Sequence, residues 1–224
     1  FFEIGPDAEV APNVMLGYRY PGCKQPTKIG ERARIHSGTV IYADTVIGHR
    51  FSCGHNVVIR AECQIGDRCV ILHGCTLEGR LKLGKGVKLM AHIYIPSSTV
   101  IGDMVFVGPG TTFLNARLPM RAAGVKGATV GNHVMIGGGV TIGPGVTIGD
   151  NVFIGAGANV VCDIPANSLA LGNPARIQPL PEKFGVRNDP KQIFCGLDLW
   201  DQRPTDDTWK DEDFPGRDAW LAGH

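Results

Sequence analysis

The sequence predicts an all-β fold, a hexapeptide solenoid in which the chain winds into a triangular parallel β-helix. The main observation is that an apolar residue recurs every sixth position, fifteen times in succession, and that the count resumes after a break. These positions are Ile29, Ile35, Ile41, Ile47, Cys53, Ile59, Ile65, Ile71, Leu77, Leu83, Leu89, Ile95, Ile101, Val107 and Phe113, then Val130, Ile136, Ile142, Ile148, Ile154 and Val160. A period of six fits neither an α-helix nor a half-exposed strand.

Two further regularities support this prediction. The position after each apolar residue is often glycine, as at Gly48 and Gly66, where a sharp bend leaves no room for a Cβ. The fifth position is small or β-branched, as at Thr45 and Val57, which suits packed strands. Each hexapeptide then supplies one strand and one turn, and three hexapeptides make one coil. Side chains three hexapeptides apart should therefore lie above one another, and stability should come from stacked neighbours.

The repeat is interrupted twice and then fades. Residues 18–27 break it early, and residues 114–129 form a larger excursion that adds eleven residues, because the next core position would otherwise be 119. We expect the excursion to be functional, since loops on a regular scaffold commonly carry function. We predict a β-helix domain over residues 1–177 and a C-terminal extension over residues 178–224. The extension holds all three tryptophans, and we expect it to cover an open end of the solenoid or to pack on a neighbouring subunit.

Charge and composition exclude several classes of partner. The chain has 22 basic and 21 acidic residues, so no overall charge attracts it to nucleic acid or to a membrane surface. The extension holds ten acids and six bases, which leaves 16 bases and 11 acids in the rest and suits an anionic small ligand. No apolar run approaches the ~20 residues that span a bilayer.

The start of the chain and its cysteines point to the cytoplasm. The chain begins Phe1-Phe2-Glu3, enters the repeat at once without a signal peptide, and lacks Met, so we expect the natural start to have been trimmed. Cys63, Cys69 and Cys75 are spaced by six and should occupy three different faces, half-buried and too far apart for a disulfide. Unpaired buried thiols indicate a reducing compartment.

Several segments carry a family resemblance. The run from Ile136 to Ala158, rich in Ile-Gly steps, and the ending Leu171-Gly172-Asn173-Pro174-Ala175-Arg176-Ile177 resemble hexapeptide-repeat acyltransferases. The stretch Val107-Gly108-Pro109-Gly110-Thr111-Thr112-Phe113-Leu114-Asn115, followed by Pro119, is similar to sugar-nucleotide N-acetyltransferases that act on 3-amino sugars. The chain departs from that pattern: Leu114 replaces Thr, Ala116 replaces an acid, and the loop arginine is displaced to Arg121 or Arg117.

The resemblance implies a homotrimer of left-handed coils with acetyl-CoA, the acyl donor, in a groove between two subunits. It also implies backbone contacts from Gly138, Ala156 and Ala158 to the pantetheine. It further implies that Lys126, Lys183 or Arg176 meets the CoA phosphates and that Pro174 packs on the adenine. The glycine and alanine residues can equally be turn residues alone. The implied acceptor is the amine of a nucleotide-linked amino sugar.

Four histidines supply the candidate catalytic groups. His36, His55, His73 and His92 are separated by steps of 19, 18 and 19, so all four should lie near one edge of the triangle, with His55 stacked on His73. Histidine is the usual general base near neutral pH. We take His73 as the favoured base and His92 as the second. In some relatives the substrate supplies its own proton path.

Other residues complete the predicted site. Asn115 would hold the acceptor or the thioester carbonyl, while His55 and Arg121 would contact the substrate. We expect the histidine edge to carry His73, His92 and Asn115 together. Glu62 or Glu78 could orient the base, although Glu78 lies one full coil after Arg60 and an Arg60–Glu78 ion pair is favoured.

Three alternatives remain open. A γ-class carbonic anhydrase uses the same solenoid to bind zinc through three histidines, two of them five residues apart, and His49 and His55 differ by six, so no metal site is expected. A non-catalytic scaffold would bind no CoA. Transfer of an acetyl or succinyl group to an amino acid or to a sugar hydroxyl is a further possibility.

Overall fold

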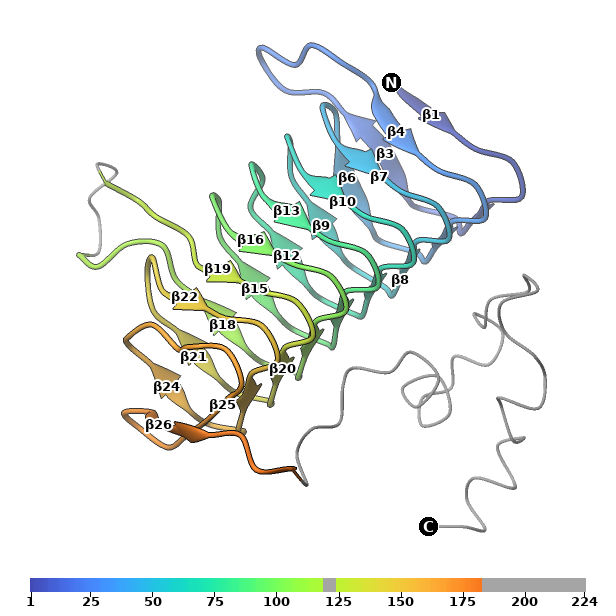
Figure 1. Ribbon diagram of the computed structural model, residues 1–224. Helices are drawn as coiled ribbons and strands as arrows, with labels where there is room; N and C mark the ends of the chain where they lie inside the picture. Colours follow the sequence, from blue (N-terminus) through green and yellow to red (C-terminus); the bar gives the residue numbers. More distant parts are fainter. Residues whose placement is uncertain (119–123, 183–224) are drawn as a thin grey trace, which may run out of the picture. The chain divides into compact units, whose positions relative to one another are not determined.

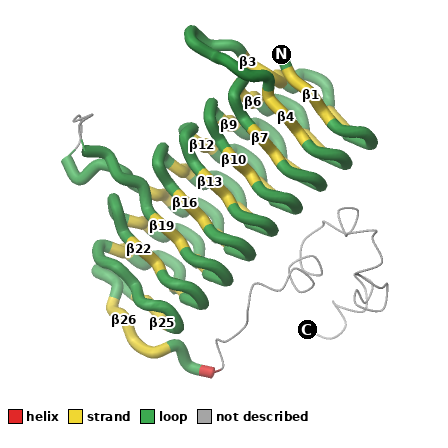
Figure 2. The backbone as a smooth tube through the Cα atoms, turned by 45° about the horizontal axis from the view of Figure 1, so that its top comes forward, coloured by secondary structure: helices red, strands yellow, loops and turns green. Residues whose placement is uncertain are grey.

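The computed structural model describes residues 1–118 and 124–182, and these form a left-handed parallel β-helix of short strands (Figures 1 and 2). The strands belong to three sheets. Sheet A contains β1 (Phe2–Ile4), β4 (Thr27–Ile29), β7 (Val46–Ile47), β10 (Gln64–Ile65), β13 (Lys82–Leu83), β16 (Val100–Ile101), β19 (Thr129–Val130) and β22 (Thr147–Ile148). Sheet B contains β2 (Glu9–Val10), β5 (Arg34–Ile35), β8 (Ser52–Cys53), β11 (Val70–Ile71), β14 (Lys88–Leu89), β17 (Phe106–Val107), β20 (Met135–Ile136), β23 (Phe153–Ile154), β25 (Ser168–Leu171) and β26 (Arg176–Pro179). Sheet C contains β3 (Met15–Tyr18), β6 (Val40–Tyr42), β9 (Val58–Ile59), β12 (Thr76–Leu77), β15 (Tyr94–Ile95), β18 (Thr112–Phe113), β21 (Thr141–Ile142) and β24 (Asn159–Val160).

The chain visits the sheets in the order A, B, C, so each coil has three corners: A–B, B–C and C–A. All strand pairs are parallel except the last, where β26 folds back antiparallel on β25. Residues on successive coils pair when they lie three hexapeptides apart, as Ile65 does with Leu83. Across the larger excursion the offset is 29, because Val100 pairs with Thr129 and the eleven added residues leave the stack.

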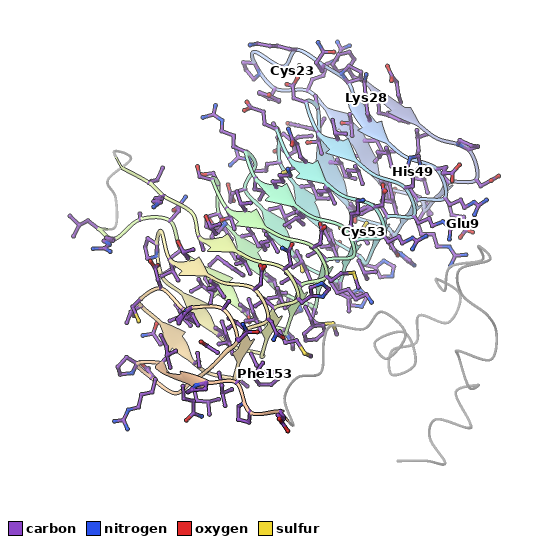
Figure 3. All side chains as sticks on the ribbon, in the orientation of Figure 1. Glu9, Cys23, Lys28, His49, Cys53 and Phe153 are labelled. Atoms are coloured by element: carbon purple, nitrogen blue, oxygen red, sulfur yellow. The ribbon has the colours of Figure 1, made fainter. Side chains whose placement is uncertain are left out.

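The repeated apolar positions point inward and form one continuous core. Ile59, Leu77, Ile95 and Phe113 follow one another in sheet C, and each is fully buried. Figure 3 shows the contrast between Cys53, which is buried, and Lys28, which projects from the outer face of sheet A. Most strands bury one core residue, and the turn that follows completes the hexapeptide, so the buried position recurs every six residues.

Three cysteines are spaced by six: Cys63, Cys69 and Cys75. They precede β10 of sheet A, β11 of sheet B and β12 of sheet C, so they occupy three faces, as the spacing predicts. All three are free thiols. They are fully rather than half buried, since the fifth hexapeptide position points into the coil interior. Burial raises the pKa of the Cys63 thiol to about 12 and that of the Cys75 thiol to about 11, so both stay protonated at neutral pH.

The two interruptions leave the coil at the same corner. The early loop lies between β3 and β4 and the larger excursion between β18 and β19, so both join sheet C to sheet A (Figure 1). The predicted extension 178–224 falls outside the described residues beyond 182, as do Pro119, Arg121 and Lys183. Within residues 1–118 and 124–182 no helix is long and apolar enough to cross a membrane.

Phe113 closes the core directly beneath the larger excursion. Its ring is fully buried, so Phe113→Ala should lower the free energy of unfolding by about 3–5 kcal/mol through lost burial and a residual cavity. Urea unfolding followed by circular dichroism measures the change. The matched control is Leu114→Ala, one residue later and exposed, which should stay within about 0.5 kcal/mol of the parent. Equal losses in the two variants would contradict the inward placement of Phe113.

Candidate functional site

The four predicted histidines lie together at the B–C corner, which we call the histidine corner. His36, His55, His73 and His92 each follow a strand of sheet B, on four successive coils. The rings of His55 and His73 are stacked with centroids 5.7 Å apart, as their spacing of one coil predicts, and His36 meets His55 edge-on at 5.0 Å. The column is therefore a real feature of the fold.

Hydrogen bonds fix where some of these imidazoles carry their protons. The His55 backbone N–H donates to Nδ1 of His73 over 3.2 Å, so this Nδ1 is an acceptor and the neutral ring holds its proton on Nε2. In His36 the situation is reversed, because Nδ1 donates to the carbonyl of Cys53 over 2.7 Å. The free nitrogen of neutral His73 is thus a hydrogen-bond donor, a poor arrangement for the favoured general base.

His92 is set differently from the other three. It is one residue out of register with His73, and its ring lies against Gly74 in the coil below, where an added Cβ would come within 2.6 Å of its Nδ1. Among the described residues no hydrogen bond to the His92 imidazole occurs, so either nitrogen can accept a proton. Of the two predicted bases, His92 is the one that the geometry leaves available.

The same corner also holds two of the predicted donor-binding residues. Gly138 and Ala156 follow strands of sheet B and continue the column that contains His55 and His73, separated from them by Ala91 and Pro109. Ala156 is exposed, and its backbone N–H and C=O take part in no hydrogen bond of the described solenoid. Both groups are free to pair with an amide-rich ligand.

Ala158 does not share that availability. It is buried in the core, its N–H donates to Gly155 and its carbonyl accepts from Thr141 over 3.0 Å. The prediction that Ala158 offers backbone partners to a ligand is wrong, because both of its backbone groups are already hydrogen-bonded within the solenoid.

Asn115 lies at the C–A corner, which we call the loop corner, and not with the histidines. It follows β18 of sheet C, and its Nδ2 donates to Oγ of Ser97 over 3.2 Å. The expectation that His73, His92 and Asn115 share one edge is therefore wrong within a single chain. A whole face of the triangle, sheet C, separates the two corners.

The remaining predicted donor contacts are divided between the two places. Lys126 lies at the loop corner, where its N–H donates to the carbonyl of Asn115 over 2.8 Å and its side chain lies against Gly145. Pro174 and Arg176 are exposed at the end of the solenoid, in the turn before β26 and within it. Within one chain these residues do not form a single cluster.

The two carboxylates proposed to orient the base are paired with arginines at the loop corner. Glu78 accepts from Arg60 over 2.7 Å, which confirms the predicted ion pair, and Glu62 accepts from Arg80 over 3.2 Å. Neither carboxylate belongs to the histidine corner, so the suggestion that one of them orients His73 is wrong.

Sequence reasoning missed a groove of about 430 Å³ at the loop corner, between the two loops. Its walls contain aromatic, charged and amide side chains. They are Tyr20, Tyr42, Arg60, Ala61, Glu62, Glu78, Arg80, Tyr94, Ser97 and Asn115. The spacing of Tyr42, Arg60 and Glu78, one coil apart in each case, was the signal that could have revealed it.

Asp44 fixes the early loop at one end of this groove. Its carboxylate accepts the Tyr20 hydroxyl over 2.5 Å and the backbone N–H groups of Lys24 and Gln25 over 3.0 and 2.6 Å. The Tyr20 hydroxyl above all, and then these N–H groups, hold the pKa of Asp44 below its ordinary 3.8, while the same bond raises the pKa of Tyr20 to about 12. Because the folded value is depressed, the contact is complete above pH 3.8 and is lost only as pH falls through that lower value.

The described residues bring no three His, Cys, Asp or Glu side chains together in a way that could hold a metal ion. At the histidine corner the rings of His55 and His73 face each other as a stack and do not converge on a shared point.

Comparison with known proteins relates part of this solenoid to a protein family. Residues 127–161, which include Gly138 and Ala156, match the family model described as bacterial transferase hexapeptide (six repeats). Over these residues the chain is similar to the hexapeptide repeats of bacterial transferases. Its match covers the coils above the histidine column, where the exposed backbone groups lie.

Two solved structures and one curated protein are similar to this hexapeptide-repeat chain. A putative acetyltransferase from Bacillus cereus is 28% identical with a TM-score of 0.50, over 77% of this chain and 87% of that one. LpxA, a UDP-N-acetylglucosamine acyltransferase from Bacteroides fragilis, is 18% identical with a TM-score of 0.64, over 95% of this chain and 84% of that one, which shows the shared fold. The bifunctional protein GlmU of Pelobacter propionicus is 29% identical over 191 residues, 78% of this chain, and the match spans only 38% of GlmU.

The early loop gives a direct test of the Asp44 contact. Asp44→Ala removes the acceptor of two backbone N–H groups, so the amides of Lys24 and Gln25 should exchange with solvent roughly ten- to a hundredfold faster at pH 7, measured by NMR hydrogen exchange. Asp103→Ala is the matched control, since that carboxylate accepts the N–H of Lys85 over 2.8 Å in a turn without a long loop. It should leave the exchange of the Lys24 and Gln25 amides unchanged. Unchanged exchange at Lys24 and Gln25 in Asp44→Ala would refute the role of Asp44.

Proposed function

We propose that this chain is a cytoplasmic, homotrimeric CoA-dependent acyltransferase that moves an acetyl group from acetyl-CoA to the amine of a nucleotide-linked amino sugar. The observation that carries the proposal is the single column at the histidine corner. The column of His55 and His73 continues through half-buried Gly138 to the exposed backbone of Ala156, inside the segment that matches the transferase family. The resemblance to the acetyltransferase from Bacillus cereus supports the choice of acyl group.

The upper part of this corner is suited to a thioester donor. Pantetheine carries amides along an extended chain, and the unpaired N–H and C=O of Ala156 can bond to them without disturbing the solenoid. Pro174 and Arg176 lie at the same end of the stack, where a nucleotide and its phosphates would emerge. The donor would thus run from the end of the solenoid towards His92.

The proton transfer is assigned to His92. Amide formation needs an amine that has lost a proton when it attacks the thioester carbonyl. Since His73 already accepts a hydrogen bond at Nδ1, its Nε2–H is suited to donate to the developing oxyanion, and the imidazole of His92 is suited to accept the proton. This assignment reverses the order of the two histidines that spacing alone favours.

Assembly brings the second corner into the site. Asn115 and Lys126 lie on the loop corner, so in one chain they are separated from His92 by sheet C. In a cyclic trimer each chain offers one surface to the neighbour on one side and a different surface to the other. The proposed active site therefore consists of the histidine corner of one subunit and the loop corner of the next. The buried free thiols of the core fit the reducing cytoplasm.

Two histidine variants test the assignment of the base. His92→Ala should lower kcat by ~10²–10⁴-fold, and His73→Ala should lower it less, because the first removes the base and the second a hydrogen-bond donor. Steady-state kinetics with acetyl-CoA and a panel of nucleotide-linked amino sugars measures both. His49→Ala is the control, since His49 lies at the A–B corner and should retain full activity. A larger loss in His73→Ala than in His92→Ala would contradict the assignment.

Subunit mixing tests the shared site. His92→Ala and Asn115→Ala trimers should each be nearly inactive, and co-expression of the two variants should restore roughly a quarter of the parental rate, because one interface in four then combines both intact residues. Rates that stay at the level of the separate variants would show that each site lies within one chain.

A thermal shift with zinc and none with acetyl-CoA or succinyl-CoA would overturn the proposed function itself.

A further inference from the structure

The groove at the loop corner is built from three adjacent columns of side chains. The middle column is small: Ala61, Gly79 and Ser97 succeed one another on consecutive coils and end at Asn115. One flanking column contains Tyr42, Arg60 and Glu78, and the other contains Asp44, Glu62 and Arg80. Small residues between two rows of long side chains leave a trough that follows the solenoid axis.

The floor of the trough has no space for a larger side chain. Gly79 has a φ of +88°, and a Cβ added there would come within 2.5 Å of the carbonyl oxygen of Ala61. The early loop, with Tyr20 fixed by Asp44, closes one end, and Asn115 stands at the other. Ala43 lies one coil before Ala61 in the small column, so four coil steps separate it from Asn115. The trough is therefore roughly 19 Å long at the usual strand spacing.

The tyrosines of the chain are concentrated here. The chain has four tyrosines, three of which line the groove, and the fourth, Tyr18, packs on Tyr42 with ring centroids 4.8 Å apart. Tyr94 is 39% exposed on sheet C, beside the trough. An exposed tyrosine ring offers an apolar face together with a hydroxyl that can form hydrogen bonds.

The charges of the residues that line the groove are balanced. Arg60 is paired with Glu78 over 2.7 Å and Arg80 with Glu62 over 3.2 Å, so the two guanidiniums and two carboxylates cancel. A phosphate would have to compete with a carboxylate for each arginine. A hydroxyl-rich ligand meets no such competition, because a hydroxyl can donate to a carboxylate and accept from a guanidinium that keep their pairing.

We infer that this trough binds the uncharged sugar ring or rings of the acceptor, with the reacting group at the Asn115 end and the phosphates outside. A pyranose has apolar C–H faces, which suit the tyrosine rings, and a rim of hydroxyls, which suits the paired charges and the Ser97 and Asn115 side chains. A volume of about 430 Å³ lies in the range of small-molecule sites. The inference rests on the proposed function only in taking the bound sugar to be the acyl acceptor.

Binding without any acyl donor tests the trough. Methyl glycosides of neutral and amino hexoses and their disaccharides are titrated against the whole chain by NMR, alongside inorganic pyrophosphate and a nucleoside monophosphate. Sugars should shift resonances of Tyr94, Ser97 and Asn115, whereas pyrophosphate should not. Tyr94→Ala should weaken sugar binding by up to roughly tenfold, and Glu78→Gln by a similar factor.

We expect both variants to fold like the parent, since Tyr94 is exposed and Glu78 belongs to a solvated ion pair. The Arg60 and Glu78 side chains are 51% and 28% exposed, and solvated ion pairs contribute little to stability. Gln64→Ala, on the outer face of sheet A, is the matched control and should bind sugars like the parent. Sugar binding that is unchanged in Tyr94→Ala and Glu78→Gln, or pyrophosphate binding in place of sugar binding, would overturn the trough assignment.

The two proposals can fail separately. Sugar binding in the trough without acyl transfer to any amino sugar would sustain the trough and overturn the proposed function. Acyl transfer with a parental KM for the acceptor in both trough variants would sustain the function and overturn the trough.

Discussion

Hydrogen bonding between coils is the constraint on which the whole molecule depends. In each coil a strand N–H donates to a carbonyl of the next coil. The N–H of Val70 donates to the carbonyl of Val87 over 2.9 Å, and that of Val58 to the carbonyl of Cys75 over 2.9 Å. These bonds satisfy the backbone of strands that are mostly two residues long and could not persist alone. Because the inward residue must be apolar on every face, a slip of one residue would expose the core, so the register is held at three hexapeptides per coil.

A fixed register converts sequence spacing into geometry. Residues that differ by one coil become neighbours in the stack, which produces the stacked rings of His55 and His73 and the Arg60–Glu78 ion pair. The eleven extra residues of the larger excursion do not disturb this order, since Val100 still pairs with Thr129. The scaffold can therefore carry two long loops at one corner while the other corners stay regular.

Counting residues in coils also shows which features of the fold and of the site the sequence could predict. The period of six predicted the fold and the histidine column, and the one-coil difference predicted the Arg60–Glu78 pair. The separation of His73 and Asn115 is two coils plus one hexapeptide, so counting in coils would already have placed them on different corners. The hydrogen bond from His55 to Nδ1 of His73 could not be predicted, because it depends on a rotamer and not on spacing. The paired state of Glu62 and the groove beside it likewise depend on side-chain conformations.

The separation of the two corners has a consequence for the proposed chemistry. If the thioester lies along the histidine corner and the sugar in the loop-corner trough, one chain alone holds each reactant but cannot join them. Only a neighbour that turns its loop corner towards the histidines supplies the acceptor, so transfer would require the assembled ring and would depend on chain concentration near the dissociation constant. A donor bound to a lone chain would then meet water but no positioned amine. Catalysis by orientation, which accounts for much of the rate in such reactions, would thus be a property of the interface and not of either surface.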